Sequence, residues 1–346
     1  MKFLLTTVLL TLVRVADLSA QQKGAAMLAQ EPACQTTRIA SAGGPMPKNQ
    51  NVAVLRYLGT ANYALEYRDQ VILFDVFYSR VKPARPLGVL PEEFTRANAI
   101  FIGHGHWDHI ADVAVVAKNT GAKVYGGQPS TAYTVKVGVP ESQTVTVKNG
   151  DVFKFNGFTV QAIQGLHSLG RPAPVGKMMD LYEETLPELI GYQQTEEEKA
   201  RWKKLQSSGA GGPDISRIGT YTYLVTFDNG FKIIYTDTAG PTTDFQKEMM
   251  TRIGGSSDVA IVAYAGRFNA QRQNQESMPL IRMFNPRLVL PSHHEDESGV
   301  GAHFDMPIYP LAMAVRDEIK GVQTIAPLYL SPICFDTTSK EVFVGK

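Results

Sequence analysis

Residues 101–113 read FIGHGHWDHIADV and place three of the chain's seven histidines within six positions. The imidazoles of His104, His106 and His109 share this stretch with the carboxylate of Asp108. A divalent metal needs nitrogen and oxygen ligands that converge at about 2.0–2.2 Å, and a tight turn can aim positions i, i+2, i+4 and i+5 at one point. Surface or hydrogen-bonded histidines are the alternative, but crowded imidazoles would repel one another when protonated. The spacing therefore predicts a metal site.

The residues that flank this motif place it at the end of a strand. The run from Asn98 to Ile102 is short, mostly apolar and without alternation, as in a strand covered on both faces, and it stops at Gly103. Gly103 and Gly105 leave space for a metal and for neighbouring backbone. Helical spacing follows over residues 110–118. We therefore expect the four polar side chains at the carboxyl end of a buried strand.

Further strands are expected on both sides of the motif. Alternating or apolar runs bounded by turn residues predict strands over 52–58, 63–67, 71–76, 123–125, 152–155, 158–167, 221–227, 231–235, 258–264 and 287–290. Later strands alternate with helical spacing, and His or Asp stands at several strand ends. The chain therefore repeats one scheme, in which polar side chains follow buried strands.

Residues 168–218 interrupt this rhythm. The segment contains Pro172 and Pro174, a charged stretch, and the glycine-rich SSGAGGP at its end. Between them lies an apolar helical face formed by Met178, Met179, Leu181, Tyr182, Leu186, Leu189 and Ile190. Because the segment starts one residue after His167, we expect a helical insertion that covers the site and selects the substrate. A helix that only pads the exterior is the alternative.

The motif at 104–109 resembles the metal signature H-x-H-x-D-H of the metallo-β-lactamase superfamily. Residues 55–76, LRYLGTANYALEYRDQVILFDV, are also similar to that family's opening strands, so the resemblance covers nearly the whole mature chain. It implies an α/β (α+β) fold, a four-layer αββα sandwich of two mixed β-sheets flanked by helices.

The same resemblance implies two divalent metal ions, expected to be Zn²⁺. Ligands beyond the motif would be His167 in GLHS, Asp237 in IIYTDTAG and a histidine of PSHH. One metal would take His104, His106 and His167, and the second Asp108, His109 and His293, with Asp237 between them. Asp75 matches an acidic residue that supports the metal site.

Several of these residues have a competing interpretation. His294 competes with His293, although the family's usual Pro-x-His pattern favours His293. Asp237 could instead cap a helix that starts near Thr242. His303 is expected in a surface loop, with a substrate contact as the alternative. Trp107 is expected to pack against a neighbouring lobe.

Two metals about 3.5–4 Å apart can hold a hydroxide between them and polarise an ester, amide or phosphoryl oxygen. The resemblance therefore implies a hydrolase of a small-molecule ester, lactone or phosphodiester, with His106 and Asp108 as catalytic residues. A residue matching Asp237 characterises the lactonase, thioesterase and phosphodiesterase branches and is generally lacking in β-lactamases, so hydrolysis of β-lactam amides comes second. A non-catalytic metal-binding protein is the third hypothesis, disfavoured because a closed structural zinc takes four protein ligands.

Composition and the two chain ends limit the partners and the location. With 34 basic and 33 acidic residues among 346, the chain has no overall field that would attract nucleic acid, and no apolar run is long enough to span a membrane. Lys2, an apolar run over 3–13, and small residues up to Ala20 indicate an export signal cleaved near Ala20, for a periplasmic or secreted protein, with a buried first helix as the alternative.

An oxidising compartment would allow the two cysteines, Cys34 and Cys334, to pair, with two buried thiols as the alternative. The expected layout is a signal peptide (1–20), a leader (21–50) and a metallo-β-lactamase-fold domain (51–346) with the insertion at about 168–218.

Overall fold

The computed structural model describes residue 24 and residues 26–168, 192–211, 213–264, 270–295 and 307–345. The expected export signal, the apolar face over 178–190 and His303 lie outside these residues. Within the described part, no helix combines the length and the apolar character needed to cross a membrane.

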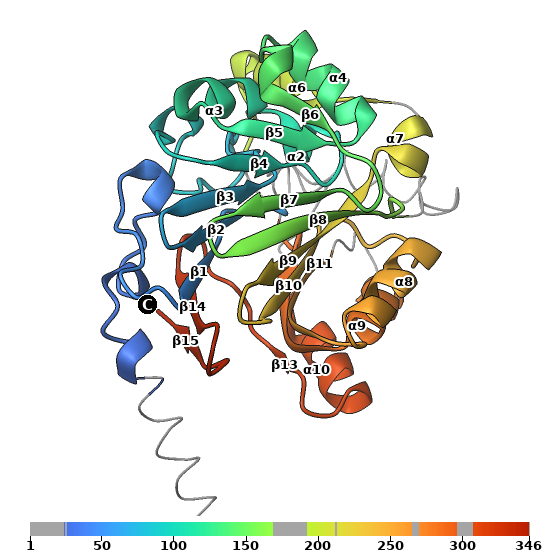
Figure 1. The fold of residues 1–346 in the computed structure, drawn as a ribbon. Helices are drawn as coiled ribbons and strands as arrows, with labels where there is room; N and C mark the ends of the chain where they lie inside the picture. Colours follow the sequence, from blue (N-terminus) through green and yellow to red (C-terminus); the bar gives the residue numbers. More distant parts are fainter. Residues whose placement is uncertain are drawn as a thin grey trace, which may run out of the picture.

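Two β-sheets face each other at the centre of the molecule (Figure 1). The first sheet runs in the order β15 (Val342–Val344), β14 (Pro332–Asp336), β1 (Val52–Tyr57), β2 (Tyr63–Tyr67), β3 (Gln70–Phe74), β4 (Ala99–Phe101), β5 (Lys123–Gly126) and β6 (Thr144–Thr146). The second runs β13 (Gln323–Thr324), β12 (Pro286–Ser292), β11 (Ser257–Ala263), β10 (Lys232–Thr236), β9 (Tyr221–Phe227), β8 (Phe158–Gln164) and β7 (Val152–Phe155). Each sheet contains both parallel and antiparallel pairs, so both are mixed.

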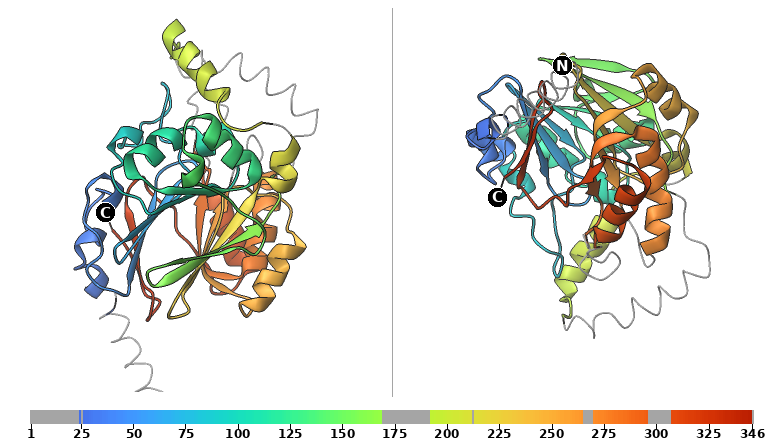
Figure 2. Two further views of the ribbon diagram at one scale, coloured as in Figure 1. Left: turned by 45° about the horizontal axis from the view of Figure 1, so that its top comes forward. Right: turned by 90° about the horizontal axis from the view of Figure 1, so that it is seen from below.

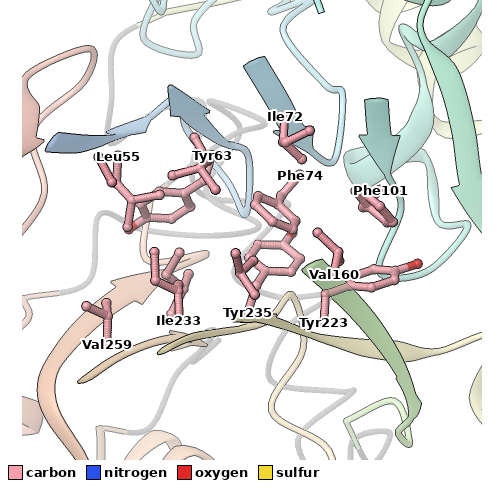
Figure 3. Close-up of a cluster of buried hydrophobic side chains, with 14 of the residues drawn as sticks. Leu55, Tyr63, Ile72, Phe74, Phe101, Val160, Tyr223, Ile233, Tyr235 and Val259 are labelled. Carbon is pink, nitrogen blue, oxygen red and sulfur yellow. The ribbon is translucent and has the colours of Figure 1, made fainter. Parts of the chain in front are cut away.

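Large aromatic side chains fill the space between the sheets (Figure 3). Phe74 of β3 stacks on Tyr235 of β10 with ring centroids 4.6 Å apart, and Phe101 of β4 lies 5.0 Å from Tyr223 of β9. Alternation along each strand aims every second residue inward, and complete burial of such a side chain stabilises the fold by about 1.5–3 kcal/mol. The core therefore fixes how the two sheets lie against each other.

Helices cover the outer faces of both sheets (Figures 1 and 2). The first sheet is covered by α3 (Val113–Thr120) and α4 (Gln128–Lys136), and the second by α8 (Asp244–Arg252), α9 (Ala270–Phe284) and α10 (Tyr309–Glu318). The predicted α/β class and the four-layer αββα architecture are confirmed. The segment expected as an insertion contains α6 (Glu196–Gln206) and α7 (Pro213–Ile218) among its described residues.

The leader lies on the outer face of β1 and β14. It contains the short 3-10 helices η1 (Pro32–Cys34) and η2 (Ala40–Ala42), and Leu28 and Ala33 are buried against Val52 and Val54. Cys34 and Cys334 form a disulfide with Cα atoms 6.0 Å apart, which confirms the expected pairing. The cystine therefore ties the leader to a strand 300 residues later in the chain.

The helix predicted over 110–118 is wrong in its boundaries. A short helix α2 (Trp107–Ile110) ends before α3 begins at Val113. Asp112 stands between them, and its carboxylate accepts hydrogen bonds from the amides of Tyr78 and Ser79, at 2.5 and 2.7 Å. A side chain that bonds distant backbone in this way favours a break in the helix.

The arrangement of strands brings several loops to one edge of the sandwich. Strands β1, β3 and β4 of the first sheet run in the same direction, and so do β8, β10 and β12 of the second. The carboxyl ends of parallel strands share an edge, which is where open α/β sheets place their ligands. The motif after β4 therefore meets residues that follow β8, β10 and β12.

Candidate metal centre

The loop after β4 is fixed by Asp75, which follows β3. The amide of Gly103 donates to Asp75 Oδ1 at 2.8 Å, and the other carboxylate oxygen lies 2.7 Å from His109 Nδ1. Asp75 has φ of +55°, a left-handed conformation that is uncommon for a residue with a side chain. Helix α2 then carries Asp108 and His109 inward on its first turn. The structure thus places Asp75 where the sequence predicted a supporting carboxylate.

His104, His106 and His167 form a first group of possible ligands. His104 Nε2 lies 2.9 Å from His106 Nδ1, and the ring of His167 lies 4.6 and 4.7 Å from the rings of His104 and His106. His167 follows β8, so the second sheet supplies one of the three imidazoles.

Asp108, His109 and His293 form a second group. Asp108 Oδ2 lies 3.1 Å from His293 Nε2 and 3.6 Å from His109 Nε2. His294 points elsewhere and stacks on Tyr57 with ring centroids 5.1 Å apart. Of the two competing histidines, the structure brings His293 to the group.

Asp237 lies between the two groups. Its Oδ2 is 2.6 Å from His104 Nδ1 and 3.4 Å from His109 Nδ1, and the three side chains form a further possible ligand set. It does not cap the following helix, because Thr243 occupies the N-cap of α8 and accepts from the amide of Gln246. A Cβ on Gly103 would lie 2.1 Å from the Asp237 carboxyl carbon. Gly103 therefore makes room for this carboxylate and not, as the sequence suggested, for a metal directly.

Burial keeps the imidazoles of the first group neutral. Burial lowers the pKa of His104 well below its usual range, and the nearby His109 lowers it further. Burial also lowers the pKa of His106 to about 4 and lowers that of His167. The neutral imidazole is the form that binds a metal ion, so these side chains are already in the protonation state that a ligand requires.

Negative charge gathers around the second group. Burial alone would lower the pKa of His109, but the carboxylates of Asp108, Asp75 and Asp237 outweigh it and raise that pKa to about 10. Burial would raise the pKa of Asp108, but His109 and His293 hold it well below its usual range. Burial and the nearby Asp237 raise the pKa of Asp75 to about 7. An imidazolium at His109 thus partly balances the carboxylates, and a bound cation could take over that function.

The residues present fit a pair of divalent cations. Asp237 Oδ1 is buried and has no hydrogen-bond partner among the described residues, which costs free energy unless a cation or donor fills the position. Imidazole and carboxylate together suit zinc and other first-row divalent metals. The donor set of the two groups therefore matches the chemistry that such an ion requires.

The aromatic support of the site was not predicted from the sequence. The hydroxyl of Tyr235 donates to Asp75 Oδ2 at 2.6 Å and is also 3.0 Å from the carbonyl oxygen of Ala61. In the sequence, Tyr235 is one of several aromatic residues in an alternating strand, so nothing distinguishes it from core residues. Its position two residues before Asp237, at a strand end, is the signal that could have found it.

The described part of the insertion contacts the motif directly. Trp202 of α6 packs edge-to-face on Trp107 with ring centroids 5.1 Å apart, and the amide of Ala210 donates to the Gly105 carbonyl at 2.6 Å. Gly209 has φ of +82°, and a Cβ there would lie 2.7 Å from the Trp107 amide nitrogen. Trp107 also packs on Phe77 at 5.2 Å. Residues 202–210 therefore lie against the loop that carries His104 and His106.

Comparisons with known proteins cover part of the sequence. The family model of a β-lactamase superfamily domain matches residues 70–187. A relative from Pyrobaculum islandicum, named a UPF0173 metal-dependent hydrolase, is 31% identical over 123 residues, which make up 35% of this chain and 54% of the relative. The match thus spans about half the length of that curated relative.

Solved structures show the same fold at low sequence identity. Igni18, a metallo hydrolase from Ignicoccus hospitalis, aligns with a TM-score of 0.56 and 13% identity over 82% of this chain and 98% of its own. A variant of the β-hydroxylase CmlA aligns with a TM-score of 0.50 and 14% identity over 84% of this chain and 54% of its own. At such identities the likeness shows the fold and not the reaction. The matched domain, the motif and the two-sheet architecture thus agree in their similarity to the metallo-β-lactamase superfamily.

Proposed function

We propose that this protein is an exported hydrolase that binds two divalent metal ions, zinc being expected, and cleaves an ester, lactone or phosphodiester in a small molecule. The observation that carries the proposal is Asp237, whose buried carboxylate lies between two groups of ligands and has one oxygen without a partner. A single closed metal site would not require this third carboxylate.

Each metal would have its own set of side chains. The first would be held by His104, His106 and His167, and the second by Asp108, His109 and His293, with Asp237 between the two positions. Asp75 and Tyr235 would orient His109 through the contact between Asp75 Oδ2 and His109 Nδ1. Such contacts fix the ring orientation and the tautomer of a ligating histidine.

The chain's own residues would assist the reaction in two ways. When bound, the metals would lower the pKa of a water molecule and polarise the oxygen of the scissile group. Asp108, which is ionised because its pKa is held low, can accept a hydrogen bond from the attacking water. His106 is neutral and less buried than His104, so it would hold its metal beside the substrate.

A metal analysis combined with a substrate panel tests the proposal. We expect zinc-reconstituted protein to hold about two ions per chain and to turn over γ-thiobutyrolactone, p-nitrophenyl acetate or bis(p-nitrophenyl) phosphate. Turnover of nitrocefin alone would favour the β-lactamase alternative. Two bound metals without turnover of any of these compounds would favour a non-catalytic metal-binding protein, and one ion or none would contradict the dinuclear centre.

We also propose that the insertion covers the metal centre and selects the substrate. Support comes from its described residues, because Trp202, Gly209 and Ala210 lie against the loop of His104 and His106. Residues at such loops commonly determine specificity on a shared scaffold.

Export is supported by two independent features. Residues 1–20 have the charged, apolar and small-residue order of an export signal, and the disulfide of Cys34 with Cys334 suits an oxidising compartment. An intact-mass measurement of protein recovered from a secreting host should give a chain that begins near Gln21. A chain that keeps Met1 and stays in the cytoplasm would contradict export.

A further inference from the structure

The backbone of His293 is held by the opposite sheet. Strand β12 ends at Ser292, and the amide of His293 donates to the carbonyl of Thr60, at 2.5 Å, in the loop after β1. Both residues adopt left-handed conformations, with φ of +56° for His293 and +51° for Thr60. Such a conformation costs a residue with a side chain about 1–3 kcal/mol and persists only where the surroundings enforce it. The loop after β1 therefore decides where the His293 imidazole points.

A buried ion pair fixes this loop. Glu295 Oε1 accepts a hydrogen bond from the amide of Thr60 and another from Arg80 Nη2 at 2.6 Å. Arg80 Nη2 also lies 3.0 Å from the Thr60 hydroxyl oxygen. Only 5% of the Arg80 side chain and 3% of the Glu295 side chain are exposed. Thr60 is thus bound through both its backbone and its side chain.

Neighbouring residues pack closely around the ion pair. A Cβ on Gly59 would lie 2.6 Å from Arg80 Nη2 and 2.7 Å from Glu295 Oε1, so only glycine fits there. The Arg80 guanidinium lies 4.5 Å above the ring of Phe77. Asn62 accepts from the Phe77 amide and donates to the Gly59 carbonyl, at 2.8 and 2.6 Å, which joins the two loops.

We propose that Arg80 and Glu295 are positioning residues that enforce the left-handed backbone of Thr60 and His293 and thereby aim the His293 imidazole at Asp108. The inference rests on the proposed function, since the second metal position is where the misplacement would be felt. Buried ion pairs contribute little net stability, because desolvation offsets their attraction. Arg80 and Glu295 instead fix the geometry of one ligand, His293, which follows the end of β12 and is no longer held by the strand pairing.

Hydrogen exchange on the metal-free protein tests the geometry independently of metal or activity. Glu295→Gln keeps the size and an acceptor oxygen but removes the charge, and Arg80→Lys keeps the charge but removes the planar fork. In both variants we expect peptides covering 58–62 and 290–295 to exchange about tenfold faster or more than in the parent chain. The matched control is Arg282→Gln, which breaks the exposed pair with Glu318 and should leave these peptides unchanged.

Metal titration then tests the consequence for the centre. In Glu295→Gln, zinc affinity at the second position, which contains His293, should fall about 10- to 100-fold, as for other residues that orient a ligand. Affinity at the first position should stay as in the parent. Turnover should fall through kcat with little change in KM.

A double variant separates positioning from folding. If either single variant fails to fold, Arg80→Met/Glu295→Leu removes both charges, which buried pairs tolerate, and should fold yet keep the fast exchange. Protection equal to the parent chain in Glu295→Gln or in the double variant would overturn the inference. If the parent chain itself binds fewer than two metals, the proposed function fails, and the exchange data still decide the inference.

Discussion

The leader and the metal centre both bury charged side chains, and they differ in how these charges are balanced. On the outer face of β1 and β2, the Arg56 guanidinium lies 3.0 Å from Glu66, and both are fully buried. Arg56 also donates to the carbonyls of Ala33, Thr36 and Leu330, at 2.6, 2.6 and 2.9 Å. The leader is therefore held by charges that find their partners within the chain.

The charges of the metal centre are not balanced by the chain's own residues. Three carboxylates, those of Asp75, Asp108 and Asp237, meet five histidines. Burial lowers the pKa of His104, His106 and His167, whereas the carboxylates raise that of His109. Asp237 Oδ1 lacks a partner among the described residues, and His104 and His106 face each other with two nitrogens 2.9 Å apart. Buried charge can therefore serve as scaffold or as ligand. An unpartnered oxygen does not separate the two regions, because Glu66 Oε2 and Asp237 Oδ1 both lack a hydrogen-bond partner among the described residues. The charge balance does, since Arg56 balances Glu66, whereas three carboxylates surround the one imidazolium of His109.

The largest expected effect separates ligand from scaffold. His106→Ala should lower turnover at least about ten-thousandfold, on the order of 5 kcal/mol in the barrier, because a metal ligand is lost. The free energy of unfolding of the metal-free protein should change by less than about 1 kcal/mol. The first effect is measured as turnover of the best substrate. The second is measured by denaturant unfolding in the presence of EDTA. Turnover near that of the parent would contradict the assignment of His106.

The reverse result is expected at the leader. Arg56→Met should lower the free energy of unfolding by about 3–5 kcal/mol, because it leaves Glu66 buried without its cation. Metal content and turnover per folded molecule should stay unchanged. The control is Arg56→Met/Glu66→Leu, which removes both charges and should recover most of the stability. If Arg56→Met instead released metal, the two regions would not be separate in function.

The pH dependence of stability sharpens the same contrast. The pKa of His109 is raised to about 10 in the folded chain, against about 6.5 when unfolded, so between these values only the folded state keeps the proton. The contribution of His109 to the free energy of unfolding is therefore complete below about pH 6.5 and is lost as the pH rises toward 10. The pKa of Asp75 is raised to about 7, so its contribution to the free energy of unfolding is already lost at that pH. Asp75 therefore adds no further change at higher pH.

We therefore expect the thermal midpoint of metal-free protein to fall between pH 7 and pH 10 by about 3 °C or more, the size of a change of about 2 kcal/mol in a chain of this length. Zinc-loaded protein should fall less, since the metal supplies the positive charge at every pH. Circular dichroism melts with and without EDTA measure the difference. His109→Gln without metal is the control, and a parent-like slope in that variant would rule out His109 as the group responsible.

The sequence predicted the centre better than its supports for a physical reason. The metal ligands are polar residues that directly follow apolar strands. His104, His167 and Asp237 therefore stand out in the sequence, because the strands before them consist mainly of residues that are easily buried. Supporting residues look ordinary, because Tyr235 fits a core pattern and Arg80 lies in a loop rich in proline and glycine. Their partners, Asp75 and Glu295, lie 160 and 215 positions away. Such contacts depend on tertiary structure, which local spacing does not encode.

The same limit applies to the strands. Alternating runs predicted the central strands of both sheets, but β14 and β15 were not predicted. Strand β14 carries a proline and a cysteine in five residues and pairs with β1, nearly the full chain length away. Its place was indicated only by the cysteine pairing, which the sequence left open.

The smallest expected effect concerns the way in which each region holds a peripheral segment. The leader is fixed by buried charges and a disulfide, whereas α6 has no buried residue and touches the metal loop through Trp202. An edge-to-face aromatic pair contributes about 0.5–1.5 kcal/mol beyond the area it buries. Docking of α6 is therefore weak enough to be loosened by one substitution, without consequences for the fold.

Trp202→Ala should raise KM about 2- to 10-fold, with zinc content and the thermal midpoint unchanged, because the pair with Trp107 is lost. The chain has two tryptophans, so the variant leaves Trp107 as its only indole emitter. Acrylamide should quench that emission more strongly once α6 no longer shields the ring. Arg201→Ala, on an exposed position of the same helix, is the control for helix propensity and charge. An unchanged KM together with increased quenching would mean that α6 shields the metal loop but does not contact the substrate. Unchanged quenching would mean that α6 stays docked without Trp202.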